Sequence, residues 1–286
     1  MINTKHLDSL LAIAQHGSFS AAGQAVGRSH SAISLHIKAL EEDLSTRLVD
    51  RTQRPPVLTP DGEALAEQAR RLHRVLGDIN AIGQGDNLAG TLAVGIVPTA
   101  MAHLAAPAMA GLRARHPDLR LEIRTGLSGE LAQSVQAADL DAALLTGPDL
   151  TPEDLVLHKV VEEPLVVIAP PGTTAQSDAE LLVSHPFIWF SRKTWAGQQI
   201  ERRLLDRGLN VSHSTEVDSL EAIEALVRHG LGVSVVPWRG TAQDLFVIPF
   251  GQPQASRRLM LTARRRTPKT RLIKALLDAL RAIQST

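Results

Sequence analysis

The sequence predicts an α/β protein with a small all-α N-terminal segment, one long connecting helix and a larger α/β domain of two lobes. Apolar residues in the first sixty positions recur at helical spacing, whereas short apolar runs alternate with amphipathic helices from about residue 90 onward. The chain also has 286 residues, about twice the usual length of one domain. We therefore expect separate units at 1–58, 59–89 and 90–286.

The composition excludes several classes of protein. The chain has no cysteine, which excludes disulfides, thiolate nucleophiles and cysteine zinc sites. No apolar run reaches the roughly 18 residues of a membrane span, and the N-terminus does not read as a signal peptide, so we expect a cytoplasmic protein with no membrane partner. Thirty basic and 30 acidic side chains cancel, so net charge does not indicate a nucleic-acid partner.

The first sixty residues are expected to form three short helices. Gly17 and Ser18 end one helix and cap the next, Gly27 permits a tight turn, and Ser29 is placed to cap a third helix. Apolar residues at spacings of four, three and four give the third helix one buried stripe, namely Ile33, Ile37, Leu40 and Leu44. The pattern therefore predicts a helix, a turn and a second helix.

The opposite face of the third helix carries mostly short polar side chains near its N-terminus, where a DNA-reading helix meets base edges. No acidic residue occurs between Asp8 and Glu41. Residues 47–58 read as two extended pieces, a wing whose arginines could contact phosphates. The expected DNA contacts are Ser18, Ser29, His30, Ser31, Ser34, Leu35, Lys38, Arg51 and Arg54. Short amphipathic helices are also common in proteins that bind no DNA, so the pattern alone leaves that alternative open.

An ordered set of motifs runs from Leu7 to Leu65: SFSAAGQAVGRSHSAISLHIKALEEDL, then RLVDR, then LTPDGEAL. With these motifs the segment resembles the winged helix-turn-helix of the LysR-type transcriptional regulators. The resemblance implies a regulator that binds a double-stranded DNA operator. The chain departs from the family at Leu48-Val49, at Ser45 and at Leu35, which stands where a polar or basic residue is usual. In place of a polar contact to a base, Leu35 could contact the methyl group of a thymine.

A long helix is expected to begin after Thr59, because a proline and an aspartate follow it. Apolar residues then recur at heptad-like spacing beside charges, as in a helix-pairing seam, namely Leu65, Ala69, Leu72, Leu76 and Ile79. A helix that lies on its own domain is the alternative. The resemblance implies an antiparallel contact between two such helices. We expect the chain to form a dimer and further a homotetramer, and we expect RNA polymerase as an additional partner. A hinge is expected at Gly83, Gly85 and Gly90.

From Thr91 onward the alternation of strands and helices occurs in two similar blocks. We expect lobe I at about 90–162 and 263–286, and lobe II at about 163–262. Ligands of open α/β sheets lie beyond the C-terminal ends of strands, near helix N-termini. The polar residues at these ends are candidates to hold a small anion: Thr99, Ser128, Thr146, Ser191, Asp218 and Ser219. Each is also explained as an ordinary helix cap.

The resemblance extends to this domain through a Gly-Thr-Leu-x-Val-Gly motif near residue 90 and the stretches ARHPDLRLEI and EAIEALVRHGLGVSVVP. It implies an effector-binding domain similar in fold to periplasmic solute-binding proteins, with a small-molecule inducer in the cleft. We expect a sequence-specific regulator controlled by an anionic effector, with no catalytic residue, cofactor or metal. The alternatives are an enzyme, for which no GxSxG, Walker or GxGxxG motif is complete, and a plain solute-binding protein, which the N-terminal segment opposes.

Overall fold

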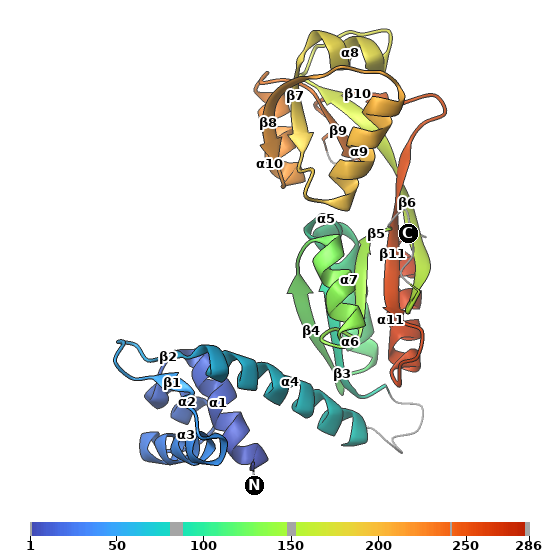
Figure 1. Cartoon of the computed structure of the whole chain (residues 1–286). Coiled ribbons are helices and arrows are strands. Elements are labelled where there is room, and N and C mark those ends of the chain that lie inside the picture. The colour runs from blue at the N-terminus through green and yellow to red at the C-terminus, as the bar shows by residue number, and fades with distance from the viewer. Residues whose placement is uncertain (1, 81–87, 148–152, 241, 284–286) are drawn as a thin grey trace. The chain divides into compact units, whose positions relative to one another are not determined.

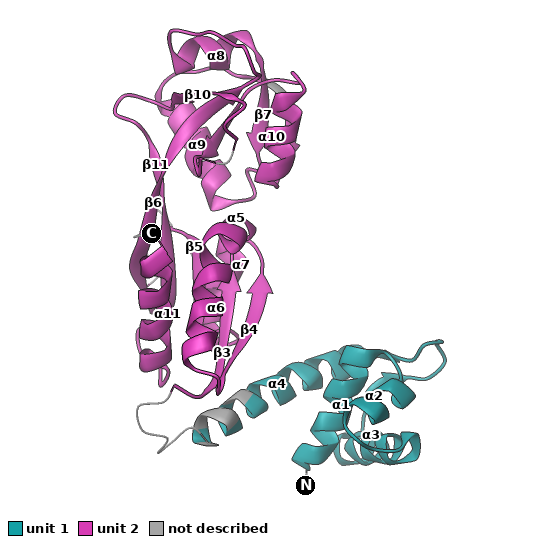
Figure 2. Ribbon diagram, turned by 180° about the vertical axis from the view of Figure 1, so that it is seen from behind, with its two compact units in different colours: residues 1–83 teal, residues 84–286 magenta. Residues whose placement is uncertain are grey.

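The computed structural model describes residues 2–80, 88–147, 153–240 and 242–283 (Figure 1). They belong to two compact units, residues 1–83 and residues 84–286, which Figure 2 colours separately. The predicted hinge glycines Gly83 and Gly85 lie outside the described residues. No helix in the described part of the chain has the length and apolar character needed to cross a membrane.

The first unit contains a three-helix bundle, a two-stranded wing and a long helix. Its elements are α1 (Thr4–His16), α2 (Phe19–Ala25), α3 (His30–Leu44), β1 (Val49–Asp50), β2 (Val57–Leu58) and α4 (Pro60–Asn80). The side chains of Asn3, Ser18 and Ser29 accept hydrogen bonds from the first turns of α1, α2 and α3, which is why these helices begin there. The wing strands pair antiparallel, with Val49 opposite Leu58.

The core of this unit forms between α1, α3 and the start of α4. Ile33, Ile37 and Leu40 are fully buried as predicted, but Leu44 is largely exposed because α3 ends at this residue. The start of α4 lies directly against the end of the bundle. A Cβ on Gly62 would lie 2.1 Å from the carbonyl oxygen of Leu48, so only glycine fits this contact.

Lobe I of the second unit is built on one mixed sheet in the order β6-β11-β5-β3-β4. Its elements are β3 (Gly90–Ile96), α5 (Pro98–Ala100), the π-helical turn η1 (Met101–Ala105), α6 (Ala106–Arg115), β4 (Leu119–Thr125), α7 (Ser128–Gln136), β5 (Ala142–Thr146), the first part of β6 (Leu155–Ala169), β11 (Ser256–Arg264) and α11 (Thr270–Ala282). Strands β3, β4 and β5 are parallel, so their C-terminal ends lie at one edge of the sheet. The residues that follow β3 and end β5 are thereby brought together.

Lobe II contains the second part of β6, where β9 and β10 pair antiparallel with it on opposite edges. Its other elements are α8 (Asp178–Ser184), β7 (Pro186–Phe190), α9 (Trp195–Asp206), β8 (Ser212–Val217), α10 (Leu220–Arg228), β9 (Ser234–Pro237) and β10 (Phe246–Pro249). Strands β7 and β8 are parallel, and the Ile188 N–H donates to the Val233 carbonyl at 2.8 Å, which links β7 to the start of β9. Phe187 and Trp189 pack edge to face in this lobe.

Strands β6 and β11 run side by side from one lobe to the other (Figure 1). The sequence places the return to lobe I at residue 263, but the structure places it earlier. Leu259 and Leu261 already pair with β5 and are buried in the core of lobe I, so the crossing lies near Arg257. The difference arises because β11 is one continuous strand, which the predicted boundary divides.

A buried ion pair lies at this crossing. Arg257 stands opposite Glu163 in the register of β6 and β11, and its Nε donates to Glu163 Oε2 at 2.6 Å. The other oxygen of Glu163 lies 2.9 Å from His103 Nε2 on η1. Burial alone would raise the pKa of Glu163, but the hydrogen bond from His103 and the charge of Arg257 lower it below its usual value. Glu163 is therefore a carboxylate at neutral pH.

We predict that Glu163→Gln destabilises the second unit by about 3–5 kcal/mol, because it leaves the buried charge of Arg257 without its partner. The pKa of Glu163 is lowered in the folded state, so its contribution is complete above the usual value of 4.5 and is lost as the pH falls below it. Urea unfolding from pH 7 to pH 3 measures both effects. The control is Glu162→Gln, at the neighbouring exposed carboxylate, which should change little; equal losses in both variants would contradict the prediction.

Candidate functional site

The N-terminal half of α3 presents a polar outer face. His30, Ser31 and Lys38 are exposed, and Ser34 is half-buried between them. Leu35 is 66% exposed on the same side of the helix. The structure thus brings five of the predicted DNA contacts onto one helix face.

Three of the four remaining predicted DNA contacts have partners within the unit. The Ser18 and Ser29 hydroxyls accept hydrogen bonds as helix caps, from Ala21 N at 3.1 Å and from Ala32 N at 3.2 Å. Arg51 lies 3.6 Å from a Glu41 oxygen, and its guanidinium lies 5.3 Å from the centre of the Phe19 ring. Arg54 is exposed on the wing.

The exposed residue Arg28 was missing from the predicted contacts. It lies in the turn between α2 and α3, directly before Ser29, the cap of α3. Its signal in the sequence was its place inside the stretch without acidic residues, between Asp8 and Glu41. A basic side chain in such a turn is available to a phosphate.

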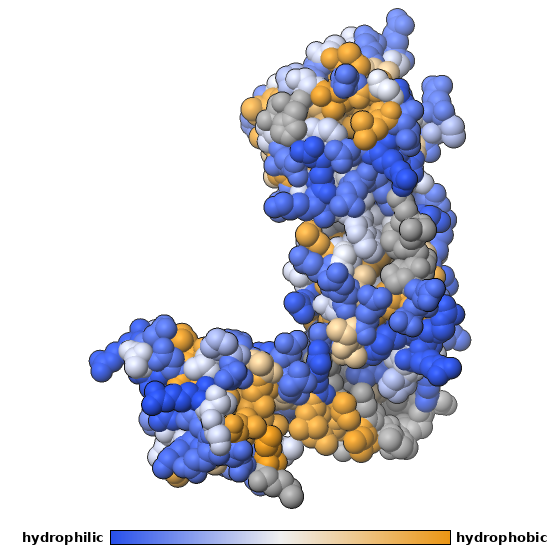
Figure 3. Space-filling view, viewed as in Figure 1, coloured by the Kyte–Doolittle hydropathy of each residue, from blue (hydrophilic) through white to orange (hydrophobic). Residues whose placement is uncertain are grey.

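The apolar seam predicted along α4 divides into two parts. Leu65 and Ala69 pack into the core of their own unit. This part of α4 thus follows the alternative given above, a helix that lies on its own domain. Leu72, Leu76 and Ile79 are exposed, and so is Val75, which the predicted seam did not include. Figure 3 shows orange apolar atoms over this C-terminal half of α4. We call the exposed residues Leu72, Val75, Leu76 and Ile79 the α4 patch.

A cavity lies between the two lobes of the second unit. It spans about 450 Å³ of space, which includes solvent at its open mouth. Four of the six predicted anion-binding residues line it, namely Thr99, Ser128, Thr146 and Asp218. The remaining lining residues are Val97, Pro98, Gly126, Leu127, Phe190, Thr194, Ala196 and Arg257. The walls are thus mostly apolar, with a few polar groups.

Two helix N-termini from different lobes meet at this cavity. Helix α7 begins at Ser128 in lobe I, and α9 begins after Thr194 in lobe II, whose hydroxyl accepts from Gly197 N at 2.9 Å. A Cβ on Gly129 would lie 3.6 Å from Trp195 Nε1, so the two helix starts are in close contact. Helix N-termini carry partial positive charge and unpaired N–H groups. The cavity is therefore suited to a negatively charged group.

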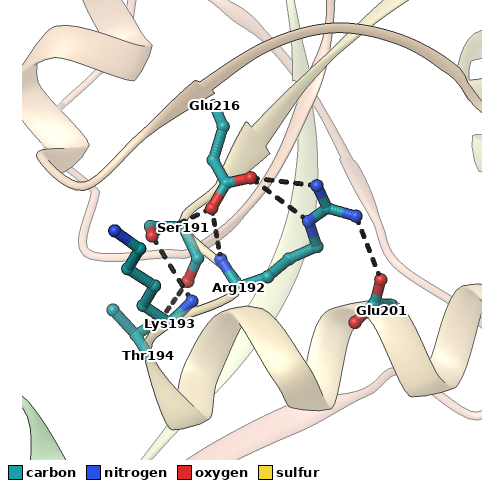
Figure 4. A network of polar contacts seen from close by, with 6 residues as sticks. All are labelled: Ser191, Arg192, Lys193, Thr194, Glu201 and Glu216. Carbon is teal, nitrogen blue, oxygen red and sulfur yellow. Dashed lines mark hydrogen bonds and ion pairs between the residues drawn. The ribbon is translucent and has the colours of Figure 1, made fainter.

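Ser191 and Ser219 do not line the cavity. The Ser191 hydroxyl donates to Glu216 Oε1 at 3.1 Å, and Arg192 binds the same carboxylate through its backbone and side chain (Figure 4). The Ser219 hydroxyl accepts from Ala222 N as the cap of α10. The hydroxyls of both residues are thus engaged within lobe II, and of the two only Ser219 is a helix cap.

Arg257 and Thr194 line the cavity but were missing from the sequence prediction. Arg257 is only 2% exposed, and its Nη1 donates to Thr99 Oγ1 at 3.0 Å. Strand alternation could have placed Arg257 on the inner face of the final strand, but the sequence holds no signal that this face meets Thr99. No group of three or more histidine and carboxylate side chains suited to a metal ion is present among the described residues.

Comparisons with known proteins agree with this organisation. Residues 4–63 match the family described as "Bacterial regulatory helix-turn-helix protein, lysR family", and residues 85–284 match the "LysR substrate binding domain". The chain is 27% identical over 297 residues to the uncharacterized HTH-type transcriptional regulator YfeR of Shigella flexneri, covering 97% of this chain and 92% of that protein. It is 28% identical over 237 residues to the HTH-type transcriptional regulator GltR of Bacillus subtilis, covering 82% and 80%.

Solved structures show the same fold over nearly the whole chain. A full-length OxyR variant from Pseudomonas aeruginosa is 25% identical, with a TM-score of 0.70 and coverage of 98% of both chains. CbnR complexed with its target DNA is similar in fold, with 18% identity, a TM-score of 0.72 and coverage of 98% and 99%. The prediction of a regulator rather than an enzyme is confirmed. The chain belongs to the LysR family of bacterial helix-turn-helix transcriptional regulators.

Proposed function

We propose that this regulator reads DNA with the outer face of α3 and responds to a small anionic effector bound between the lobes. The observation that carries the proposal is the cavity where the starts of α7 and α9 meet beside Arg257. In this assignment residues 1–58 bind DNA, 59–89 link and dimerise, and 90–286 bind the effector. The effector changes the relative preference for two arrangements of the protein, and DNA binding or activation changes with it.

The α3 face suits the major groove for two reasons. The helix is free of acidic residues over its first eleven positions, so it does not repel phosphates. Its side chains near the N-terminus are short enough to let the backbone approach base edges, while Leu35 offers an apolar contact to a thymine methyl. The CbnR structure in complex with DNA supports this use of a shared fold.

We predict that Ser34→Glu abolishes operator binding without unfolding the first unit. A lost base contact costs about 1–3 kcal/mol, and the new carboxylate adds repulsion from the phosphates. The measurement is a gel-shift titration with a DNA fragment selected by the wild-type protein, with circular dichroism to check folding. Gln15→Glu on the exposed side of α1 adds the same charge and should bind nearly normally. Normal binding of the DNA fragment by a folded Ser34→Glu protein would refute the assignment of the α3 face to DNA binding.

The α4 patch is the proposed contact between two copies of the chain. Four large apolar side chains on one side of a helix gain stability when a second helix covers them. A dimer formed this way presents two α3 helices to one operator, and two dimers would form the homotetramer. RNA polymerase is the proposed further partner on DNA, and all of these partners place the protein in the cytoplasm.

We predict that Leu76→Glu lowers the mass of the oligomer measured by sedimentation velocity, because a charge in the centre of the patch opposes its burial. Arg70 is exposed on the other side of α4, so Arg70→Glu changes the charge by more and should leave the mass unchanged. Unchanged sedimentation of Leu76→Glu would show that the patch is not the contact.

The cavity is proposed to hold a small carboxylate. The hydroxyls of Thr99, Ser128 and Thr146 are donors, the two helix N-termini favour negative charge, and the apolar walls accept a short carbon chain. Asp218 at the exposed edge of the cavity would meet a hydroxyl or amino group of the same molecule.

We predict that a thermal-shift screen of small carboxylates on the full-length protein identifies at least one stabilising compound. Thr146→Val should weaken its binding about tenfold, because a hydrogen bond to a charged group contributes about 1.5–3 kcal/mol. The control is Thr262→Val, a buried threonine on the neighbouring strand β11 whose hydroxyl donates to Val156 O, away from the cavity. The absence of any stabilising carboxylate would contradict an anionic effector.

A further inference from the structure

Two arginines flank Glu163 from opposite edges of β6. On one edge Arg257 of β11 stands directly opposite Glu163. On the other edge Pro237 of β9 pairs with Leu165, and the N–H of Trp238 donates to Pro164 O at 2.8 Å. Arg239 follows at the next position, level with Glu163. Residues opposite one another across neighbouring strands share a face of the sheet, so Arg257 lies on the face that carries the Glu163 side chain. Arg239 lies two residues beyond the end of β9, close enough for its charge to interact with Glu163.

The hydrogen bonds of this cluster are incomplete. Nε and Nη2 of Arg239 are buried and have no hydrogen-bond partner among the described residues. Nη2 of Arg257 lies 2.5 Å from Glu163 Oε2 as an ion pair but makes no hydrogen bond in the described structure. Buried N–H groups of a guanidinium without an acceptor cost free energy, and charged donors cost the most. Two buried donors of Arg239 are therefore left without an acceptor among the described residues.

The charges of the cluster are also unbalanced. Glu163 is the carboxylate that directly pairs with Arg257, and it acts on Arg239 as well. Glu221 and Glu224 of α10 act on Arg239 from a distance without a hydrogen bond or close ion pair to it in the described structure. Burial lowers the pKa of both arginines, and each cation opposes the other's charge. The buried Arg257 and the half-buried Arg239 therefore share one carboxylate, Glu163.

We propose that the guanidinium groups of Arg239 and Arg257 form a carboxylate-binding site at the crossing of the two lobes. The planar fork of an arginine matches a carboxylate in two parallel hydrogen bonds, and Nε with Nη2 of Arg239 form such a fork. The added negative charge balances the second cation. Because Arg257 and Glu163 lie on the strands that join the lobes, a carboxylate bound here stabilises one relative placement of the lobes.

This site is distinct from the proposed effector cavity, although Arg257 contributes to both. Arg239 does not line the cavity. The site therefore accepts a carboxylate whether or not the hydroxyl groups of the cavity bind an effector, and the two proposals fail independently.

The test measures the melting temperature of the full-length protein while sodium acetate replaces sodium chloride at constant ionic strength. We expect a saturable rise for the wild-type protein and roughly tenfold weaker apparent binding for Arg239→Gln. Arg239→Lys keeps the charge without the fork and should give an intermediate value. The matched control is Arg258→Gln, which removes an exposed arginine beside Arg257 on the same strand and should respond like the wild type.

Two further readouts make the outcome decisive. Thr262→Val should leave the acetate response unchanged, since its hydroxyl donates to Val156 O and contacts neither arginine. In chloride alone, Arg239→Gln should melt no lower than the wild type, because it removes a half-buried cation that lacks its own partner. The proposal is overturned if acetate gives no saturable rise, if Arg239→Gln responds like the wild type, or if inorganic phosphate binds and acetate does not.

Discussion

The ion pair between Glu163 and Arg257 is the interaction on which the two-lobed domain depends. It lies where β6 and β11 carry the chain between lobes, and both side chains are buried. A buried ion pair gives little net stability compared with apolar residues, but its geometry is demanding, because either charge alone would be costly. A shift in the register of the crossing strands would separate these two charges and would therefore be costly. The same arginine donates to Thr99, so the crossing also positions one wall of the cavity.

The cavity follows from how the lobes are built. Parallel strands in lobe I bring the residues after β3 and at the end of β5 to one edge, and α7 begins beside them. Lobe II contributes the capped start of α9 from the opposite side. Neither lobe alone surrounds a ligand. A bound carboxylate would contact both, which is the physical means by which binding favours one arrangement of the domain.

Helix α4 lies in two different environments along its length. Its first turns pack against the bundle, where Gly62 permits close contact with the Leu48 carbonyl, and its later turns carry the exposed α4 patch. A continuous heptad-like pattern arises from both requirements, since core packing and helix pairing each need apolar residues at spacings of three and four. This is why the sequence pattern did not distinguish Leu65 and Ala69 from Leu72 and Leu76.

The sequence by itself determined the helices of the first unit, the wing, the alternation of the α/β domain and the family, because caps, periodicity and ordered motifs are local. It also singled out four residues that line the cavity, since strand ends and helix starts are visible in a sequence: Thr99, Ser128, Thr146 and Asp218. Only the tertiary structure decided that the Ser191 hydroxyl bonds Glu216 instead of lining the cavity, and that Arg257 pairs with Glu163. These contacts join residues dozens of positions apart, and strand register, which no local pattern specifies, brings them together.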